Sequence, residues 1–159
     1  MPYGAAIIFW RLSLIKATNV NKTVKYESDL DTAKGTESAI VFVLGAITTR
    51  LLLILTDRNM EQIPVVGEDG KPDFVRKMNE ASMIYDTVKF GLRDVINADK
   101  ITDEEGKSLK FETEYVSVNG GKFVAVKDSF LSALPFELIT ELAIQINNIN
   151  TVLEEERKN

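Results

Sequence analysis

The clearest hydrophobic pattern in the chain lies in residues 128–159. Apolar side chains recur there every three or four positions, which predicts the buried face of an amphipathic helix. They are Leu131, Leu134, Leu138, Leu142, Ile146, Ile149 and Leu153. Asp128 or Ser129 can cap a short first turn, and Pro135 suits the first position of the main helix because its missing amide costs nothing there.

The flank beside this apolar face is unusual because it carries no charge between Leu142 and Leu153. Its polar positions are Gln145, Asn147, Asn148 and Asn150. An exposed helix normally presents Lys and Glu to water, so the flank suggests contact with a further element or a partner chain. A solvated flank of small polar residues is the alternative.

The first half of the chain indicates strands followed by a helix. Ala5–Ile15 is rich in apolar and aromatic residues, which favours a strand buried at one end. Residues 17–38 are polar and loop-rich, with a short edge strand expected around Val24 and Tyr26. Ala39–Leu44 has the β-branched and aromatic content of a central strand, which ends at Gly45.

A helix is expected next, from Thr49 to about Gln62, with Thr48 or Thr49 as its N-cap. Residues 63–72 contain two prolines and two glycines and predict a surface loop. A second helix is then expected from a cap at Asp73 to about Ala98. Its apolar stripe is Phe74, Met78, Ala81, Tyr85, Val88, Leu92 and Val95.

Gly91 lies inside this expected helix, where glycine is unfavourable, so either close packing or a kink is anticipated there. Thr102–Lys107 is a charged turn, and a strand with an irregularity is expected from Leu109 to Val118. Asn119–Gly121 then predicts a tight hairpin connection to a strand at Lys122–Val126. The fold class is therefore α+β in one domain over residues 1–159, with a small mixed or antiparallel sheet, about three substantial helices and a long C-terminal helix.

The amino-acid composition excludes several classes of function without identifying one. The 159 residues carry a net charge of -5 and no His or Cys. Scattered basic residues in an acidic chain argue against nucleic-acid binding. The missing His and Cys exclude the usual triads, cysteine nucleophiles and zinc fingers. No signal peptide is expected from Gly4–Trp10, and no membrane span from Ala39–Leu55, which Arg50 interrupts.

Candidate chemistry is sparse. The GEDGK segment at Gly67–Lys71 lacks the glycine spacing and the Ser or Thr of a phosphate-binding loop, so a plain turn is favoured. Aligning Gly106 with the glycine of a calcium loop places Ile101 at the first ligand position, which excludes that site. No catalytic, cofactor-binding or metal-binding residue is predicted, and the chain is not expected to be an enzyme. A carboxylate-based hydrolase or transferase using Asp103 or Glu105 is the least favoured alternative.

Two carboxylate pairs are spaced by two residues, which on a strand would place both members on one face. They are Asp29 with Asp31 and Glu112 with Glu114. A solvated face is favoured over acid–base chemistry for both pairs.

For three further residues, a binding role and a purely structural role are both considered. Arg50 is either an anion contact at a helix N-terminus or a surface residue, and the surface role is favoured. Phe9 and Trp10 are either core residues, the favoured reading, or interface anchors.

The order of these segments resembles the small proteins encoded among the tail and neck genes of tailed bacteriophages. The resemblance covers roughly residues 20–150 and is one of pattern, without a catalytic motif. It is carried by VKYESDLD (24–31), IVFVLGAITTR (40–50), FGLRDVINA (90–98), DEEGKSLKFE (103–112) and FLSALPFELITELAIQI (130–146). It implies a non-enzymatic role in virion structure or tail assembly, in the virion or in the host cytoplasm during assembly.

The expected partners are other phage structural proteins or further copies of the chain, without nucleic acid, membrane or cofactor. The alternative is a cytoplasmic adaptor or transient tail-assembly chaperone that binds one protein. The interface predicted from the sequence consists of Phe9, Trp10, Gln145, Ile146, Asn147, Asn150 and Leu153.

Overall fold

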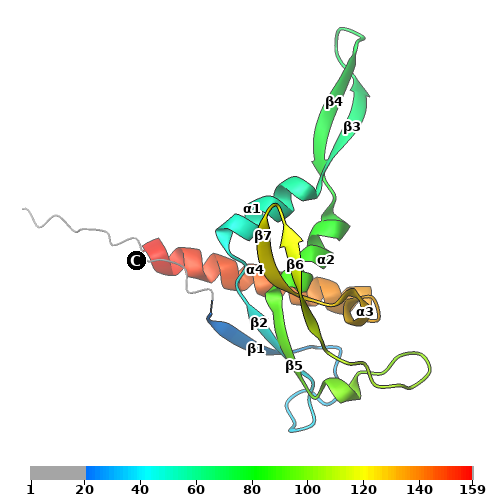
Figure 1. The fold of residues 1–159 in the computed structure, drawn as a ribbon, viewed down its shortest axis with the longest axis vertical. Coiled ribbons are helices and arrows are strands. Elements are labelled where there is room, and N and C mark those ends of the chain that lie inside the picture. The colour runs from blue at the N-terminus through cyan, green and yellow to red at the C-terminus, as the bar shows by residue number, and fades with distance from the viewer. Residues whose placement is uncertain (1–20, 159) are drawn as a thin grey trace, which may run out of the picture.

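The computed structural model describes residues 21–158, with side chains described as far as residue 151. The expected strand at Ala5–Ile15, together with Phe9 and Trp10, lies outside these residues, as does the side chain of Leu153. Helices and antiparallel strands are mixed along the chain, which confirms the α+β class (Figure 1).

The first half of the chain contains β1 (Thr23–Glu27), β2 (Val41–Gly45), α1 (Thr49–Arg58), β3 (Met60–Val66) and β4 (Pro72–Met78). The second half contains α2 (Glu80–Gly91), β5 (Leu92–Ile96), the 3-10 turn η1 (Ala98–Lys100), β6 (Thr113–Val118), β7 (Gly121–Val126), α3 (Asp128–Leu131) and α4 (Phe136–Lys158).

The strands form three small antiparallel sheets in place of the single sheet expected. The largest has the order β1-β2-β5, so β2 is central and β1 lies at an edge, as the sequence predicted. Phe42 of β2 lies opposite Tyr26 on one side and Val95 on the other. The hairpins β3-β4 and β6-β7 form the other two sheets.

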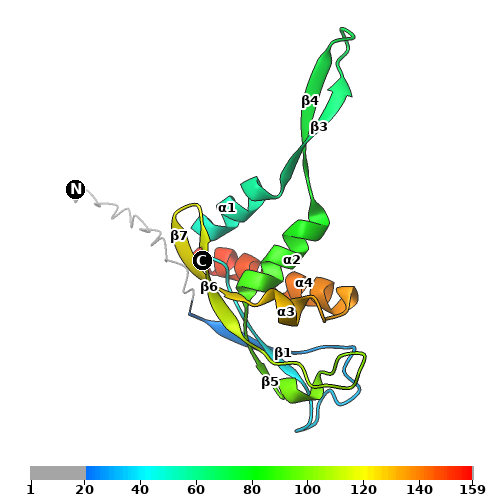
Figure 2. The ribbon, with the colours of Figure 1, turned by 45° about the vertical axis from the view of Figure 1, so that its right-hand side comes forward.

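The elements other than β3 and β4 form the body of the protein. It is built around α2, which contacts α1, α4, β5 and β7. The helix α4 lies across the body and also contacts β2 (Figures 1 and 2). The predicted apolar stripe of this region is confirmed as core for Leu131, Leu134, Leu138, Leu142 and Ile146, and Ile149 packs against the core.

Gly91 is the last residue of α2, and the close-packing interpretation is the one the structure supports. A Cβ atom at this position would lie 2.6 Å from Cδ1 of Ile146. Ile146 is completely buried, so α2 and α4 can approach this closely only because residue 91 has no side chain.

Two predicted helices are wrong over residues 59–98. The first ends at Arg58, four residues early, because Asn59 caps it and Met60 begins a strand. The second begins only at Glu80, after Asn79, and ends at Gly91. The residues expected at its two ends lie in β4 and β5. The loop predicted at 63–72 lies within the β3-β4 hairpin, where only residues 67–71 form the turn.

Among the smaller features, two predictions are confirmed and one boundary is wrong. Thr48 caps α1 by accepting a hydrogen bond from the Leu51 amide, at 3.2 Å. Asn119 and Gly120 form the predicted tight turn, with φ of 44° and 74°. The strand expected from Leu109 begins only at Thr113.

The entry to the C-terminal helices differs in detail from the prediction. Neither Asp128 nor Ser129 caps α3, because Lys127 occupies the N-cap position and makes no side-chain capping bond. Pro135 directly precedes α4, and its carbonyl accepts the first hydrogen bond, from the Ile139 amide.

Candidate interaction surfaces

The most prominent surface is the β3-β4 hairpin, called the arm here and defined as residues 60–78. The arm projects away from the body in both views (Figures 1 and 2). Its strands are paired along their full length, from Met60 opposite Met78 to Val66 opposite Pro72. Seven paired residues extend a strand by roughly 20 Å. Two strands without a third layer are only marginally stable in water, so an arm of this length suits a surface that a partner covers.

The register assigns the side chains of the arm to two faces. One face pairs Ile63 with Val75, with Val65 beyond them. The side chains of Ile63 and Val75 are 38% and 51% exposed.

The opposite face carries a larger apolar patch at the outer end of the arm. Pro64 lies opposite Phe74, and Val66 lies opposite Pro72. Phe74 is 61% exposed and Val66 is 79% exposed. Apolar side chains therefore meet water on both faces of the arm, and clustered exposure of this kind marks interaction sites in soluble proteins.

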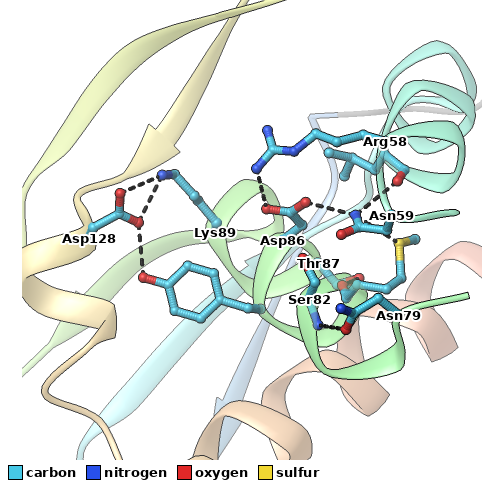
Figure 3. Close-up of polar contacts among 11 residues, drawn as sticks. Arg58, Asn59, Asn79, Ser82, Asp86, Thr87, Lys89 and Asp128 are labelled. Atoms are coloured by element: carbon cyan, nitrogen blue, oxygen red, sulfur yellow. Dashed lines mark hydrogen bonds and ion pairs between the residues drawn. The ribbon is translucent and has the colours of Figure 1, made fainter. Parts of the chain in front are cut away.

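A buried polar cluster holds the base of the arm (Figure 3). Asp86 of α2 is 2% exposed and accepts hydrogen bonds from Arg58 at 3.2 Å and from the Asn59 side chain at 2.8 Å. The same Asn59 amide nitrogen donates to the Leu55 carbonyl, at 2.9 Å. The end of α1 is thereby fixed against α2 at the point where the arm begins.

The return strand is fixed in the same way. The Asn79 backbone amide donates to the Asn59 carbonyl at 2.8 Å, which joins the two ends of the arm. Its side-chain oxygen caps α2 by accepting from the Ser82 amide, and its side-chain nitrogen donates to Glu61. Both ends of the arm are therefore tied to helix termini, and its direction is set by the body.

A second polar cluster joins α2 to α3 on the other side of α2 (Figure 3). Asp128 accepts hydrogen bonds from Lys89 at 2.8 and 2.9 Å and from the Tyr85 hydroxyl at 2.9 Å. The Lys89 hydrogen bond, followed by that of Tyr85, holds the pKa of Asp128 below its usual range. Burial and the Asp128 carboxylate raise the pKa of Tyr85 to about 12.

A groove of about 480 Å³ lies between the start of α1, β5 and β7, and it is called the α1-β7 groove here. Its lining is Asn21, Thr23, Ile47, Thr48, Leu51, Phe90, Arg93, Lys122, Phe123 and Val124. Phe90 and Phe123 meet edge to face, with ring centroids 6.5 Å apart. Among the described residues, the lining contains two cations, Arg93 and Lys122, and no carboxylate.

Arg93 is placed at the groove by an irregularity in the sheet. Leu92 pairs with Leu44 and Asp94 pairs with Val43, so Arg93 is the extra residue of a bulge. Its side chain crosses Gly45, where a Cβ atom would lie 2.5 Å from Nε, and it donates to the Ala46 carbonyl at 2.8 Å.

No carboxylate among residues 21–151 forms an ion pair with this guanidinium. Burial lowers the pKa of Arg93 without removing its charge. A partly buried cation with no counterion is a site that an incoming carboxylate would stabilise.

The interface predicted on α4 is only partly exposed. Ile146 is completely buried against Gly91, so its assignment to a contact surface was wrong. Asn150 turns toward the body, and its side-chain oxygen accepts from the Ile47 amide at 3.1 Å. Its side-chain nitrogen is buried and has no hydrogen-bond partner within the described part of the chain.

The rest of the uncharged flank meets water to differing degrees. Asn147 and Asn148 are exposed, and Gln145 is half-buried. Gln145 and Asn148 line a small cleft of about 160 Å³ between α4 and β1. The flank is therefore divided between a structural bond at Asn150 and an exposed strip at Asn147 and Asn148.

The sequence pattern also missed the residue that ties α4 to β1. Glu141 accepts hydrogen bonds from Tyr26, from Ser28 at 2.7 Å and from the Asp29 amide at 2.9 Å. Burial alone would raise the pKa of Glu141, but these hydrogen bonds outweigh it and lower that pKa.

The carboxylate pairs do not form a common site. Asp31 closes a loop by accepting from the Ile40 and Ala33 amides, and these two hydrogen bonds, that of Ile40 first, lower the pKa of Asp31. Glu112 precedes β6 and accepts from Lys127 at 2.6 Å. Within the described residues, no three carboxylates are grouped so that they could hold a metal ion.

Two other candidates lie at the surface. The GEDGK segment turns between β3 and β4, with Gly70 at a φ of 73°. Arg50 is exposed in the first turn of α1.

No protein family, curated protein or solved structure matches this chain. Among the described residues, no helix has the length and apolar character needed to cross a membrane.

Proposed function

We propose that this protein is a non-enzymatic structural or assembly protein that acts through protein–protein contacts. The observation that carries the proposal is the arm, whose outer half presents Ile63, Val66, Phe74 and Val75 to water. The buried cluster around Asp86 supports it further, because a fixed base presents an apolar hairpin in one direction at low conformational cost.

The context we propose is the tail or head-to-tail region of a tailed bacteriophage, with the other structural proteins of that region or further copies of this chain as partners. The pattern resemblance over residues 20–150 supports this context. The protein would act in the virion, or in the host cytoplasm during assembly.

The test is the mass of the full chain, alone and mixed with the products of its neighbouring genes, by light scattering and native mass spectrometry. Complexes larger than the monomer are expected. Replacing Val66 and Phe74 together with Asp should abolish them, because charges would be placed in the apolar contact. Leu53→Asp, at an exposed position on α1, is the matched control and should assemble normally.

A particle proteome separates a permanent virion component from a transient assembly chaperone. A one-to-one complex with a single protein, together with absence from purified particles, would favour the adaptor alternative. A monomer under every condition would refute the proposed function.

A further inference from the structure

The tip of the arm is acidic as well as apolar. Between Val66 and Phe74 the chain carries Glu68, Asp69 and Asp73 against one cation, Lys71. Lys71 pairs with Asp69 at 3.1 Å, so Glu68 and Asp73 have no ion-pair partner among the described residues.

The α1-β7 groove has the complementary character. Half of its lining residues are apolar or aromatic, its lining cations are Arg93 and Lys122, and none of the described residues that line it carries a carboxylate. Its volume of about 480 Å³ is large enough to receive several side chains. An apolar hairpin tip with unpaired carboxylates therefore matches this groove in both hydrophobicity and charge.

The arm cannot reach the groove of its own chain without releasing its base. Asn59, Asn79 and Asp86 fix both ends of the arm to α1 and α2, and the arm leads away from the body (Figures 1 and 3). A match between two surfaces that cannot meet within one molecule points to contact between two molecules.

We propose that the arm tip of one copy docks in the α1-β7 groove of a second copy of this chain. The inference rests on the proposed function and names its partner. Phe74 and Val66 would cover Phe123 and Val124, and Glu68 would lie between Lys122 and Arg93, where it supplies the carboxylate that Arg93 lacks. Because a different surface of each copy is used, the contact is heterologous and builds a ring or an open helical stack.

The first test uses disulfide crosslinking, because the chain has no cysteine and only introduced thiols can react. Val66→Cys on one copy and Val124→Cys on another are mixed under mild oxidation. A crosslinked dimer containing one of each is expected. Val66→Cys mixed with Ile144→Cys, an exposed position on α4, is the control and should crosslink poorly.

The second test exchanges charges at two exposed positions. Glu68→Lys and Lys122→Glu should each weaken self-association about tenfold or more, since each places like charges in contact. The double variant should recover most of the loss, because opposite charges again face one another in the heterologous contact. Circular dichroism and urea unfolding verify that all three variants fold.

Recovery in the double variant together with the selective crosslink supports the inference. Self-association that persists without either result overturns the docking mode and leaves the proposed function intact. A chain that neither self-associates nor crosslinks also overturns the docking mode. The proposed function fails separately, if mixtures with the neighbouring gene products contain only monomers.

Discussion

Asp86 illustrates how one buried residue determines the position of an exposed element. Its carboxylate is 2% exposed, yet it accepts from Arg58 and Asn59, which end α1 immediately before the arm. The carboxylate remains satisfied only while α1 stops at this point. The geometry of the arm therefore depends on a residue that lies outside it.

Replacing Asp86 with Ala should lower the free energy of unfolding by about 2–4 kcal/mol, because the buried Asn59 side chain loses an acceptor and the half-exposed Arg58 loses its ion pair. Urea denaturation of the full chain measures the change. Asp57→Ala is the matched control, since it removes an exposed ion pair with Arg76 and should cost under about 1 kcal/mol. Equal losses in the two variants would contradict the role of Asp86.

Replacing Gly91 with Ala should destabilise the fold by about 1–3 kcal/mol, although Ala is the better helix former, because the new methyl group would collide with Ile146. A smaller residue at 146 relieves the collision. The double variant Gly91→Ala with Ile146→Ala should therefore lose less than the sum of the two single losses in urea denaturation, because Ala at 146 removes Cδ1 and both γ carbons, which would lie 2.6–3.0 Å from the new Cβ atom. Strict additivity would show that the collision is not what limits this position.

At the scale of elements, sequence reasoning succeeded where one pattern persisted along an element. The period of α4, the central strand at Val41–Gly45 and the Asn119–Gly120 turn were all predictable from local chemistry. It failed at residues 59–98, because apolar residues at a spacing of three and four continued through the boundaries between β4, α2 and β5. Asn59 marks the boundary between α1 and β3, and Asn79 marks that between β4 and α2, but the contacts that fix Asn59 there come from the distant residues Asp86 and Asn79.

The candidate surfaces were less predictable than the elements. The uncharged flank of α4 was visible in the sequence, but the burial of Ile146 and the bond from Ile47 to Asn150 arise from packing with distant residues. The groove at Arg93 depends on a bulge in β5 and on the missing side chain at Gly45. No local sequence pattern indicates either feature.

The contact between α4 and β1 should be sensitive to acid. The pKa of Glu141 is lower in the folded protein than its ordinary value of about 4.3, so its stabilisation is present above that pH and is lost as the pH falls through the folded pKa. Glu141→Gln should cost about 1–2 kcal/mol at pH 7 and progressively less below pH of about 4. Urea denaturation across this pH range measures the difference. A loss that is independent of pH would contradict the role of the carboxylate.

The exposed strip on α4 can now be tested apart from its structural neighbour. Replacing Asn147 and Asn148 together with Glu should leave the free energy of unfolding within about 0.5 kcal/mol. The same double variant should weaken assembly only if this strip is a contact, which light scattering reports. Asn150→Glu is unsuitable for this purpose, because it would also disturb the hydrogen bond from Ile47.

At the scale of the whole molecule, the protein combines a well-packed body with a hairpin that the body does not cover. Core residues from α2, α4, β2 and β7 form one cluster, whereas the arm contributes none of its residues to it. We propose contact with another chain as the role of this element, which adds exposed apolar surface without adding core.

The most direct test of this account is the mass of the full chain compared with that of the Val66→Asp, Phe74→Asp double variant, measured by native mass spectrometry alone and with the neighbouring gene products. The account predicts complexes for the unmodified chain and only monomer for the folded double variant. Identical mass distributions for the two proteins would contradict it.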